Sequence, residues 1–185
     1  MSRYPGKKIE IWFQDETRFG QKTRLTAVWA ESGSRPIVLA QNRFGNAYIF
    51  GAVNPESGSK IGLISSHCDS EIMTMHMQEI GNCLSPQSHA IVVMDGAGWH
   101  KSEQLKIPDN ISICHLPPYC PELNPIERLW LWIKDRYLSH RLFETMDNLI
   151  DAGTEAWRNV QSMHVQSICR MSLKCRGTLA AASPN

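Results

Sequence analysis

The run HAIVVM at residues 89–94 decides the fold, and it stops at Asp95 in the sequence DGAG. Apolar side chains at nearly every position are typical of a strand that is buried on both faces, as in a parallel sheet covered by helices. A second short strand is expected at residues 111–116 (ISICHL), where two prolines end it. The sequence therefore predicts buried strands in the second half of the chain, with Asp95 directly after one of them.

Four further strands are expected before this run, at residues 8–15 (KIEIWFQD), 23–30 (TRLTAVWA), 46–53 (NAYIFGAV) and 60–65 (KIGLIS). Gly20 lies in the loop between the first two, which favours a hairpin there. The segment NPESGS that precedes the last of these strands is rich in turn-forming residues. These features predict an antiparallel meander.

Helical periodicity appears at residues 70–84, from Asn124 onward, and at about residues 145–160. Strands followed by helix, strand, short helix, strand and helix indicate an α/β domain. Its mixed sheet would combine the antiparallel meander with parallel strands and carry flanking helices. We expect residues 1–160 to form this domain and residues 161–185 to be a tail that is partly helical or frayed.

The composition is that of an ordinary globular domain. The chain has 185 residues, of which 42% are hydrophobic and 20% charged, which excludes a disordered protein. It contains no apolar run of the roughly 18–20 residues that a membrane span needs, and its first residues, MSRYPGKK, lack the apolar core of a signal peptide. We therefore expect no membrane contact and a cytoplasmic location.

The cysteines and the net charge limit the possible binding sites. Six cysteines are present and none forms a C-x-x-C pair, so reduced thiols are favoured over a zinc knuckle. The net charge of +1 is far from that of a protein that grips DNA by bulk electrostatics alone. A DNA-acting site in this chain must attract its substrate through metal ions and local basic residues.

Three acidic residues have positions that suit metal chemistry. Asp15 closes the first expected strand, Asp95 closes the buried strand, and Glu127 lies in the first turn of the helix after Asn124. Carboxylates on rigid elements are the ligands with which two Mg²⁺ ions cleave phosphodiesters, and gathering them raises the pKa of at least one. Each residue also has a plainer interpretation: Asp15 as a solvated loop acid, Asp95 as a turn residue, and Glu127 as part of a capping box.

Three longer segments closely resemble the conserved blocks of DDE-superfamily transposases, and most of all the bacterial insertion-sequence branch of the mariner-type transposases. The resemblance covers roughly residues 8–160, and its third block is long and idiosyncratic. The segments are residues 12–20 (WFQDETRFG), 92–102 (VVMDGAGWHKS) and 116–130 (LPPYCPELNPIERLW). The resemblance implies an RNase H-like fold and assigns catalysis and metal binding to Asp15, Asp95 and Glu127.

The same resemblance implies a reaction and partners. Members use two Mg²⁺ or Mn²⁺ ions to nick DNA at transposon ends, and the freed 3′-hydroxyl then attacks target DNA. Cys120 stands where the family usually has serine. Full-length members also carry an N-terminal helix-turn-helix region, whereas this sequence starts almost at the first catalytic strand. We therefore expect a nucleoid-associated catalytic half that works as a homodimer or with a partner transposase chain carrying that region.

Four residues near the blocks are candidate auxiliary or DNA-contacting residues: His100, Lys101, Arg18 and Arg128. The plainer interpretations are a loop histidine packed beside its neighbouring tryptophan and arginines on solvated surfaces. Tryptophans of the last two helices are expected in the core or at a dimer surface.

Two other functions stay open. A ribonuclease H-type nuclease would share the fold but would not transfer strands. A truncated, non-autonomous transposase remnant would only pair with a full-length protein.

Overall fold

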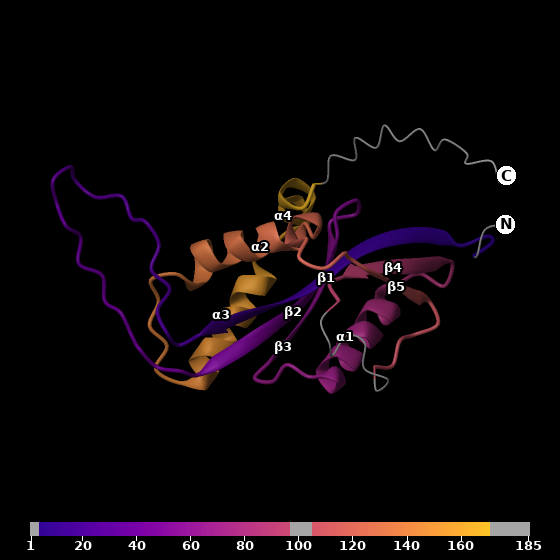
Figure 1. Cartoon of the computed structure of the whole chain (residues 1–185), viewed down its shortest axis with the longest axis horizontal. Coiled ribbons are helices and arrows are strands. Elements are labelled where there is room, and N and C mark those ends of the chain that lie inside the picture. The colour runs from indigo at the N-terminus through magenta and orange to yellow at the C-terminus, as the bar shows by residue number, and fades with distance from the viewer. Residues whose placement is uncertain (1–3, 97–104, 171–185) are drawn as a thin grey trace.

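The computed structural model describes residues 4–96 and 105–170, and its centre is a five-stranded sheet (Figure 1). The strands lie in the order β3-β2-β1-β4-β5. Their bounds are Lys8–Gly20 for β1, Asn46–Asn54 for β2, Ser59–Ser65 for β3, Ser88–Met94 for β4 and Ile111–His115 for β5. The sheet is mixed as expected, because β1, β2 and β3 pair antiparallel while β4 runs parallel to both β1 and β5.

Strand β1 belongs to two ladders that meet at Phe13. Residues 8–13 pair with β4, whereas residues 13–20 pair with β2. Phe13 itself is opposite Val53 on one side and Val93 on the other. Beyond Phe13, β1 has a neighbouring strand on one edge only within the described residues.

Helices cover both faces of the sheet, which confirms the expected flanking arrangement. Helix α1 (Ser70–Cys83) packs on one face through a cluster that includes Trp12, and Asp69 caps it by accepting from two backbone amides. The other face carries α2, α3 and α4 in a second cluster. Their bounds are Ile126–Ile133, Met146–Arg158 and Ser162–Ile168, with short helical turns at Pro121–Leu123 and Lys134–Leu138 beside α2.

Two glycines, Gly51 and Gly62, leave room on the sheet for large side chains of the second cluster. Asp15, Gly51 and Gly62 stand opposite one another on β1, β2 and β3. A Cβ at Gly51 would lie 2.4 Å from Cη2 of Trp130, and one at Gly62 would lie 2.2 Å from Nε1 of Trp157. The two indoles, whose centroids are 5.6 Å apart, therefore rest directly on backbone, and Trp130 comes close to Asp15.

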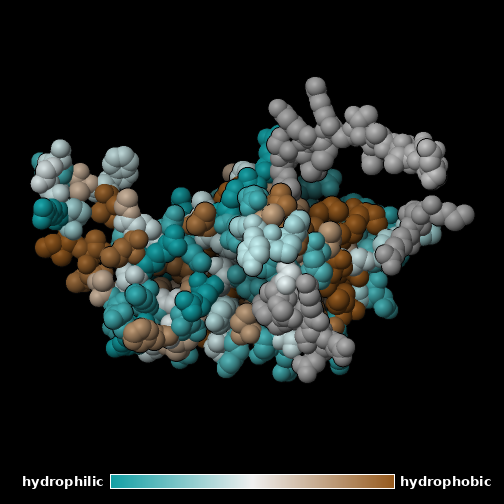
Figure 2. Space-filling model, viewed as in Figure 1, coloured by the Kyte–Doolittle hydropathy of each residue, from teal (hydrophilic) through white to brown (hydrophobic). Residues whose placement is uncertain are grey.

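The expected strand at residues 23–30 is wrong. Residues 21–45 have no helix or strand and form a long arm that projects from the domain at the left of Figure 1. The arm carries large side chains that face solvent, among them Trp29 and Ile37. Figure 2 shows brown, hydrophobic residues gathered on the same projection. The apolar pattern of this segment has no core to cover, so it does not produce a strand.

The arm also explains why the first strand is longer than expected. The first strand continues past Asp15 to Gly20, and its hairpin partner is β2 rather than residues 23–30. The two ends of the arm are held by the same residue, because the side chains of Gln21 and Gln41 both donate to the carbonyl of Phe143.

The segment after residue 160 begins with an ordered helix. In α4 and just after it, Val165 and Cys169 are buried in the same cluster as α2 and α3. Residues 171–185 lie outside the described part of the chain. No helix in the described part is both long and apolar enough to cross a membrane.

Candidate active site

The three predicted carboxylates line one cavity of about 490 Å³. Asp15 comes from β1, Asp95 follows β4 directly, and Glu127 lies in the first turn of α2. The register of β1 and β4 places the two aspartates close together. The parallel ladder ends where Phe13 lies opposite Val93, and an aspartate follows two residues later on each side. Ligands of open α/β sheets bind at such carboxyl ends of strands.

Helix α2 is fixed to the sheet at the point where it supplies Glu127. The side chain of Asn124 donates to the carbonyl of Gln14 at 2.9 Å, one residue before Asp15. The helix begins at Ile126 with Pro125 in the N-cap position, and the side chain of Asn124 accepts a long hydrogen bond of 3.4 Å from the backbone amide of Ile126. The capping-box interpretation of Glu127 is therefore wrong, and its exposed carboxylate lines the cavity instead.

The pKa of the Asp15 carboxyl is strongly perturbed. Burial raises its pKa from 3.8 to about 8, with further upward contributions from the negative charges of Glu127 and Glu16. The indole of Trp130 donates to Oδ2 of Asp15 at 2.9 Å, which favours the ionised form and limits the rise. This is the effect expected when carboxylates are gathered, with burial as its largest cause.

The donor chemistry of the cavity fits a hard divalent cation. Its acidic residues offer only oxygen ligands, which Mg²⁺ and Mn²⁺ prefer. Glu127 and Glu16 both raise the pKa of Asp15 through their negative charges, so a bound cation would offset repulsion between these carboxylates. Within residues 4–96 and 105–170, no three His, Cys, Asp or Glu side chains are already close enough together to hold a metal ion.

The two described auxiliary candidates, Arg18 and Arg128, do not line the cavity that holds the three carboxylates. His100 and Lys101 fall outside the described residues. Arg18 is exposed on β1 and lines a neighbouring cavity, not the one with the carboxylates. Arg128 is exposed on α2, and its guanidinium donates to the carbonyl of Arg170 at 3.0 Å, beyond the end of α4. The structure therefore brings together the three acidic residues but neither described arginine.

Trp130 and Tyr119 are site residues that the sequence analysis did not identify. Trp130 was expected in the core, and it is buried, but its indole also holds Asp15. Its spacing of three from Glu127, which puts both on one helix face, was the available signal. Tyr119 lies on the rim of the cavity with a φ of 60° and a fully exposed side chain. Left-handed backbone at a non-glycine residue is strained and often occurs at functional sites.

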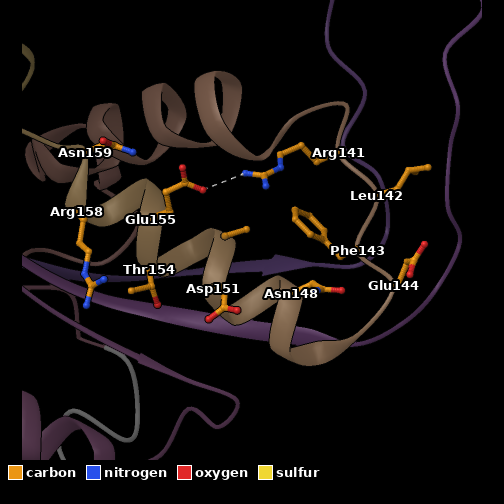
Figure 3. Close-up of a pocket in the computed structure, with 11 residues that line it drawn as sticks. Arg141, Leu142, Phe143, Glu144, Asn148, Asp151, Thr154, Glu155, Arg158 and Asn159 are labelled. Carbon is orange, nitrogen blue, oxygen red and sulfur yellow. Dashed lines mark ion pairs between the residues drawn. The ribbon is translucent and has the colours of Figure 1, made fainter.

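A larger cavity lies between α3 and residues 141–144 (Figure 3). It measures about 790 Å³ and contains none of the three carboxylates. Arg141 and Glu155 face one another across it at 3.9 Å, and both are substantially exposed. This mixed and open surface lacks the concentrated charge of the carboxylate cavity, so we do not assign the chemistry to it.

Residues 10–150 match the family model of the DDE superfamily endonucleases. An uncharacterized protein of Sinorhizobium fredii is 44% identical over 114 residues, which cover 62% of this chain and 84% of that protein. The Tc3 transposase of Caenorhabditis elegans is 22% identical over 174 residues, covering 87% of this chain and 52% of the transposase.

Solved structures support the same fold. The Mos1 mariner paired end complex with Mn matches with a TM-score of 0.64 at 14% identity, covering 86% of this chain and 51% of that chain. The Mos1 strand transfer complex matches with a TM-score of 0.62, also at 14% identity, covering 86% and 50%.

These likenesses confirm the expected RNase H-like fold, and the present chain spans about half the length of the transposases that it matches. The family model covers most of the chain, including Asp15, Asp95 and Glu127. The chain therefore belongs to the DDE superfamily of endonucleases.

Proposed function

We propose that this chain is the catalytic domain of a DNA transposase and that Asp15, Asp95 and Glu127 bind two Mg²⁺ or Mn²⁺ ions. One observation carries the proposal: carboxylates from three distant parts of a DDE-superfamily chain line a single cavity. Such a pair of ions, when bound, activates an attacking hydroxyl and stabilises the leaving oxygen of a phosphodiester.

The residues of the chain prepare the cavity for this role. Asp15 gives up its proton before it acts as a ligand, since its pKa of about 8 keeps it largely protonated at neutral pH. Trp130 orients the carboxylate by its hydrogen bond to Oδ2. Asn124 holds the start of α2 against β1 and so fixes the position of Glu127 relative to Asp15. The cavity then has a rigid wall on the strand side and an exposed carboxylate on the helix side.

The proposed reaction has two steps on DNA. Hydrolysis at a transposon end frees a 3′-hydroxyl, and this hydroxyl attacks a phosphodiester of target DNA. We further propose that end recognition depends on a helix-turn-helix region outside these 185 residues, supplied within a homodimer or by a partner transposase chain. Because the substrate is DNA, we propose a cytoplasmic, nucleoid-associated location.

Nicking of supercoiled plasmid tests the metal-dependent step. The purified chain should nick in Mn²⁺ or Mg²⁺ and not in excess chelator, and Asp95→Asn should abolish nicking. Asp109→Asn is the matched control, because Asp109 is also an exposed aspartate next to a strand end but lies outside the cavity. Undiminished nicking in chelator, or by Asp95→Asn, would refute the assignment.

Strand joining distinguishes the proposal from its alternatives. A pre-nicked transposon-end duplex with a free 3′-hydroxyl should become joined to target DNA. Nicking without joined product would favour a nuclease that does not transfer strands, and cleavage of an RNA–DNA hybrid would favour a ribonuclease H-type activity. A chain that neither nicks nor joins in either metal would be a catalytic remnant.

A further inference from the structure

A second, smaller cavity of about 300 Å³ lies where β1 runs into the arm and α2 ends. Four basic side chains line it: Arg18, Lys22, Arg24 and Lys134. No acidic residue is among its lining residues. We call it the cationic cavity.

Most of this positive charge is not neutralised by the protein. Arg24 forms an ion pair with Asp135 at 3.2 Å, in which both side chains are about half exposed. In the described part of the chain, Arg18, Lys22 and Lys134 form no ion pair. Burial lowers the pKa of Lys134, and the neighbouring charges of Arg24 and Arg18 lower it further. An anion in this cavity would therefore relieve a real excess of positive charge.

Two parts of the chain, β1 and the helical run that begins with α2, each carry residues of both the cationic cavity and the cavity that holds the three carboxylates, which we call the carboxylate cavity. On the helical run from α2, Lys134 follows Glu127 by seven residues, which places both on one face about 10 Å apart. On β1, Arg18 follows Asp15 by three residues, a rise of about 10 Å, and this odd spacing turns the two side chains to opposite faces of the sheet. Lys134 is therefore the basic residue that shares a face with a carboxylate. The charges of Glu127 and Asp15 also raise the pKa of Lys134, so the two cavities interact electrostatically.

The approach to the cationic cavity is open, and its walls are held in place. Beyond Phe13 no described strand covers the second edge of β1. The backbone amide of His140 donates to the carbonyl of Arg24 at 3.1 Å, and the side chain of Gln21 donates to the carbonyl of Phe143 at 2.9 Å. These bonds fix the root of the arm, so part of the cationic cavity is formed before any ligand arrives.

We infer that the cationic cavity binds a backbone phosphate of the DNA strand whose scissile phosphate lies in the carboxylate cavity. Lysine and arginine bind phosphate oxygens through charge-assisted hydrogen bonds that fix the register of DNA without reading its sequence. At about 3.4 Å of helix axis per nucleotide, a separation of about 10 Å corresponds to roughly three nucleotides. The inference rests on the proposed function, because it takes DNA as the substrate.

Binding of a short DNA duplex in Ca²⁺, measured by fluorescence anisotropy at several salt concentrations, tests the cationic cavity without cleavage. Lys134→Met keeps the length of the side chain and removes its charge. For one lost phosphate contact, the slope of log K against log salt should fall by about 0.9, and affinity at 0.1 M salt should fall roughly eightfold. Parental affinity and slope for this variant would overturn the inference.

Lys8→Gln is the matched control. It removes the same charge at the opposite end of β1, where Lys8 is highly exposed, and it should leave affinity unchanged. An equal loss in both variants would mean that only net charge matters, which would also overturn the inference. The thermal midpoint of Lys134→Met, measured in parallel, should equal or exceed that of the parent, because burial disfavours the charged form of Lys134. A binding defect together with such a midpoint is not a loss of fold.

Two further measurements identify the source of the phosphate. Inorganic phosphate titrated at constant ionic strength should not compete with the duplex; saturable competition abolished by Lys134→Met would assign the cationic cavity to a small anion instead. The second measurement uses DNA with one uncharged methylphosphonate about three nucleotides from the mapped nick. In Mn²⁺ this change should slow nicking by the parent, and it should not slow nicking by Lys134→Met any further. Absence of nicking by every protein would refute the proposed activity, whereas the Ca²⁺ binding result would still decide the inference.

Discussion

Replacing Asp15 by asparagine should stabilise the metal-free protein at alkaline pH. The folded carboxyl has a pKa of about 8 against 3.8 for the unperturbed group. Between these values the folded state keeps a proton that the unfolded chain has lost, so stability is greatest below about pH 4 and falls as pH rises to about 8. Asparagine carries no charge at any of these pH values, and its amide oxygen can still accept from Trp130.

The size of the effect follows from the shift. At about 1.4 kcal/mol per pH unit, ionising a group with a pKa raised by this much costs at most about 6 kcal/mol. Asp15 is partly exposed and solvent screens its charge, so we expect roughly 2–4 kcal/mol. The stability advantage of the variant over the parent should therefore be smallest at pH 5, should grow as pH rises, and should reach this amount at pH 8.5.

Urea unfolding in chelator at pH 5, 7 and 8.5 measures this difference directly. Other groups that titrate in this range, such as Lys60 with its pKa near 8, are present in both proteins and cancel. Mn²⁺ should restore stability to the parent at pH 8.5 and should have little effect on the variant, because a ligand that binds only the folded state stabilises it. A constant difference between the two proteins at all three pH values would refute the raised pKa of Asp15.

Three more changes test the surroundings of Asp15. Glu127→Gln removes a like charge and should lower the pKa of Asp15, as carboxyl ¹³C chemical shifts would record; an unchanged pKa would mean that the two groups do not interact. Trp130→Phe removes a hydrogen bond that favours the ionised form, so the midpoint of the pH profile for nicking should move upward, and a downward shift would contradict this. Gly62→Ala forces a methyl group into the indole of Trp157 and should cost about 1–3 kcal/mol in urea unfolding, whereas parental stability would show that the indole moves freely.

Asp95 and Glu127 could be predicted because their positions at the ends of elements are local features. The apolar run that becomes β4 and the helical spacing after Asn124 fix where Asp95 and Glu127 lie on their elements. The raised pKa of Asp15 depends on burial, and Trp130, whose indole contacts Asp15, packs closely over Gly51. The periodicity of the sequence does not predict that contact.

The arm was mispredicted for a related reason. Residues 23–30 are rich in β-branched and apolar residues, as strands are, but this composition produces a strand only when one face has a core to cover, and here Leu25 and Trp29 face solvent. The end of the first strand was also placed at Asp15, although β1 continues to Gly20. The length of a strand depends on the strand with which it pairs. The strand that pairs with this part of β1 is β2, which comes after the arm in the sequence and not directly after the first loop.

The two ladders of β1 also govern when the carboxylates can meet as the chain folds. The meander of β1, β2 and β3 joins segments that follow one another, whereas the ladder with β4 pairs Lys8 with Ser88 and must close a long loop of chain. Asp95 and Glu127 emerge from the ribosome later still, and α2 must dock before Glu127 can face Asp15. A nascent chain that has formed only the meander has one of its three carboxylates in place, so the carboxylate cavity is completed only after the second half of the chain has folded.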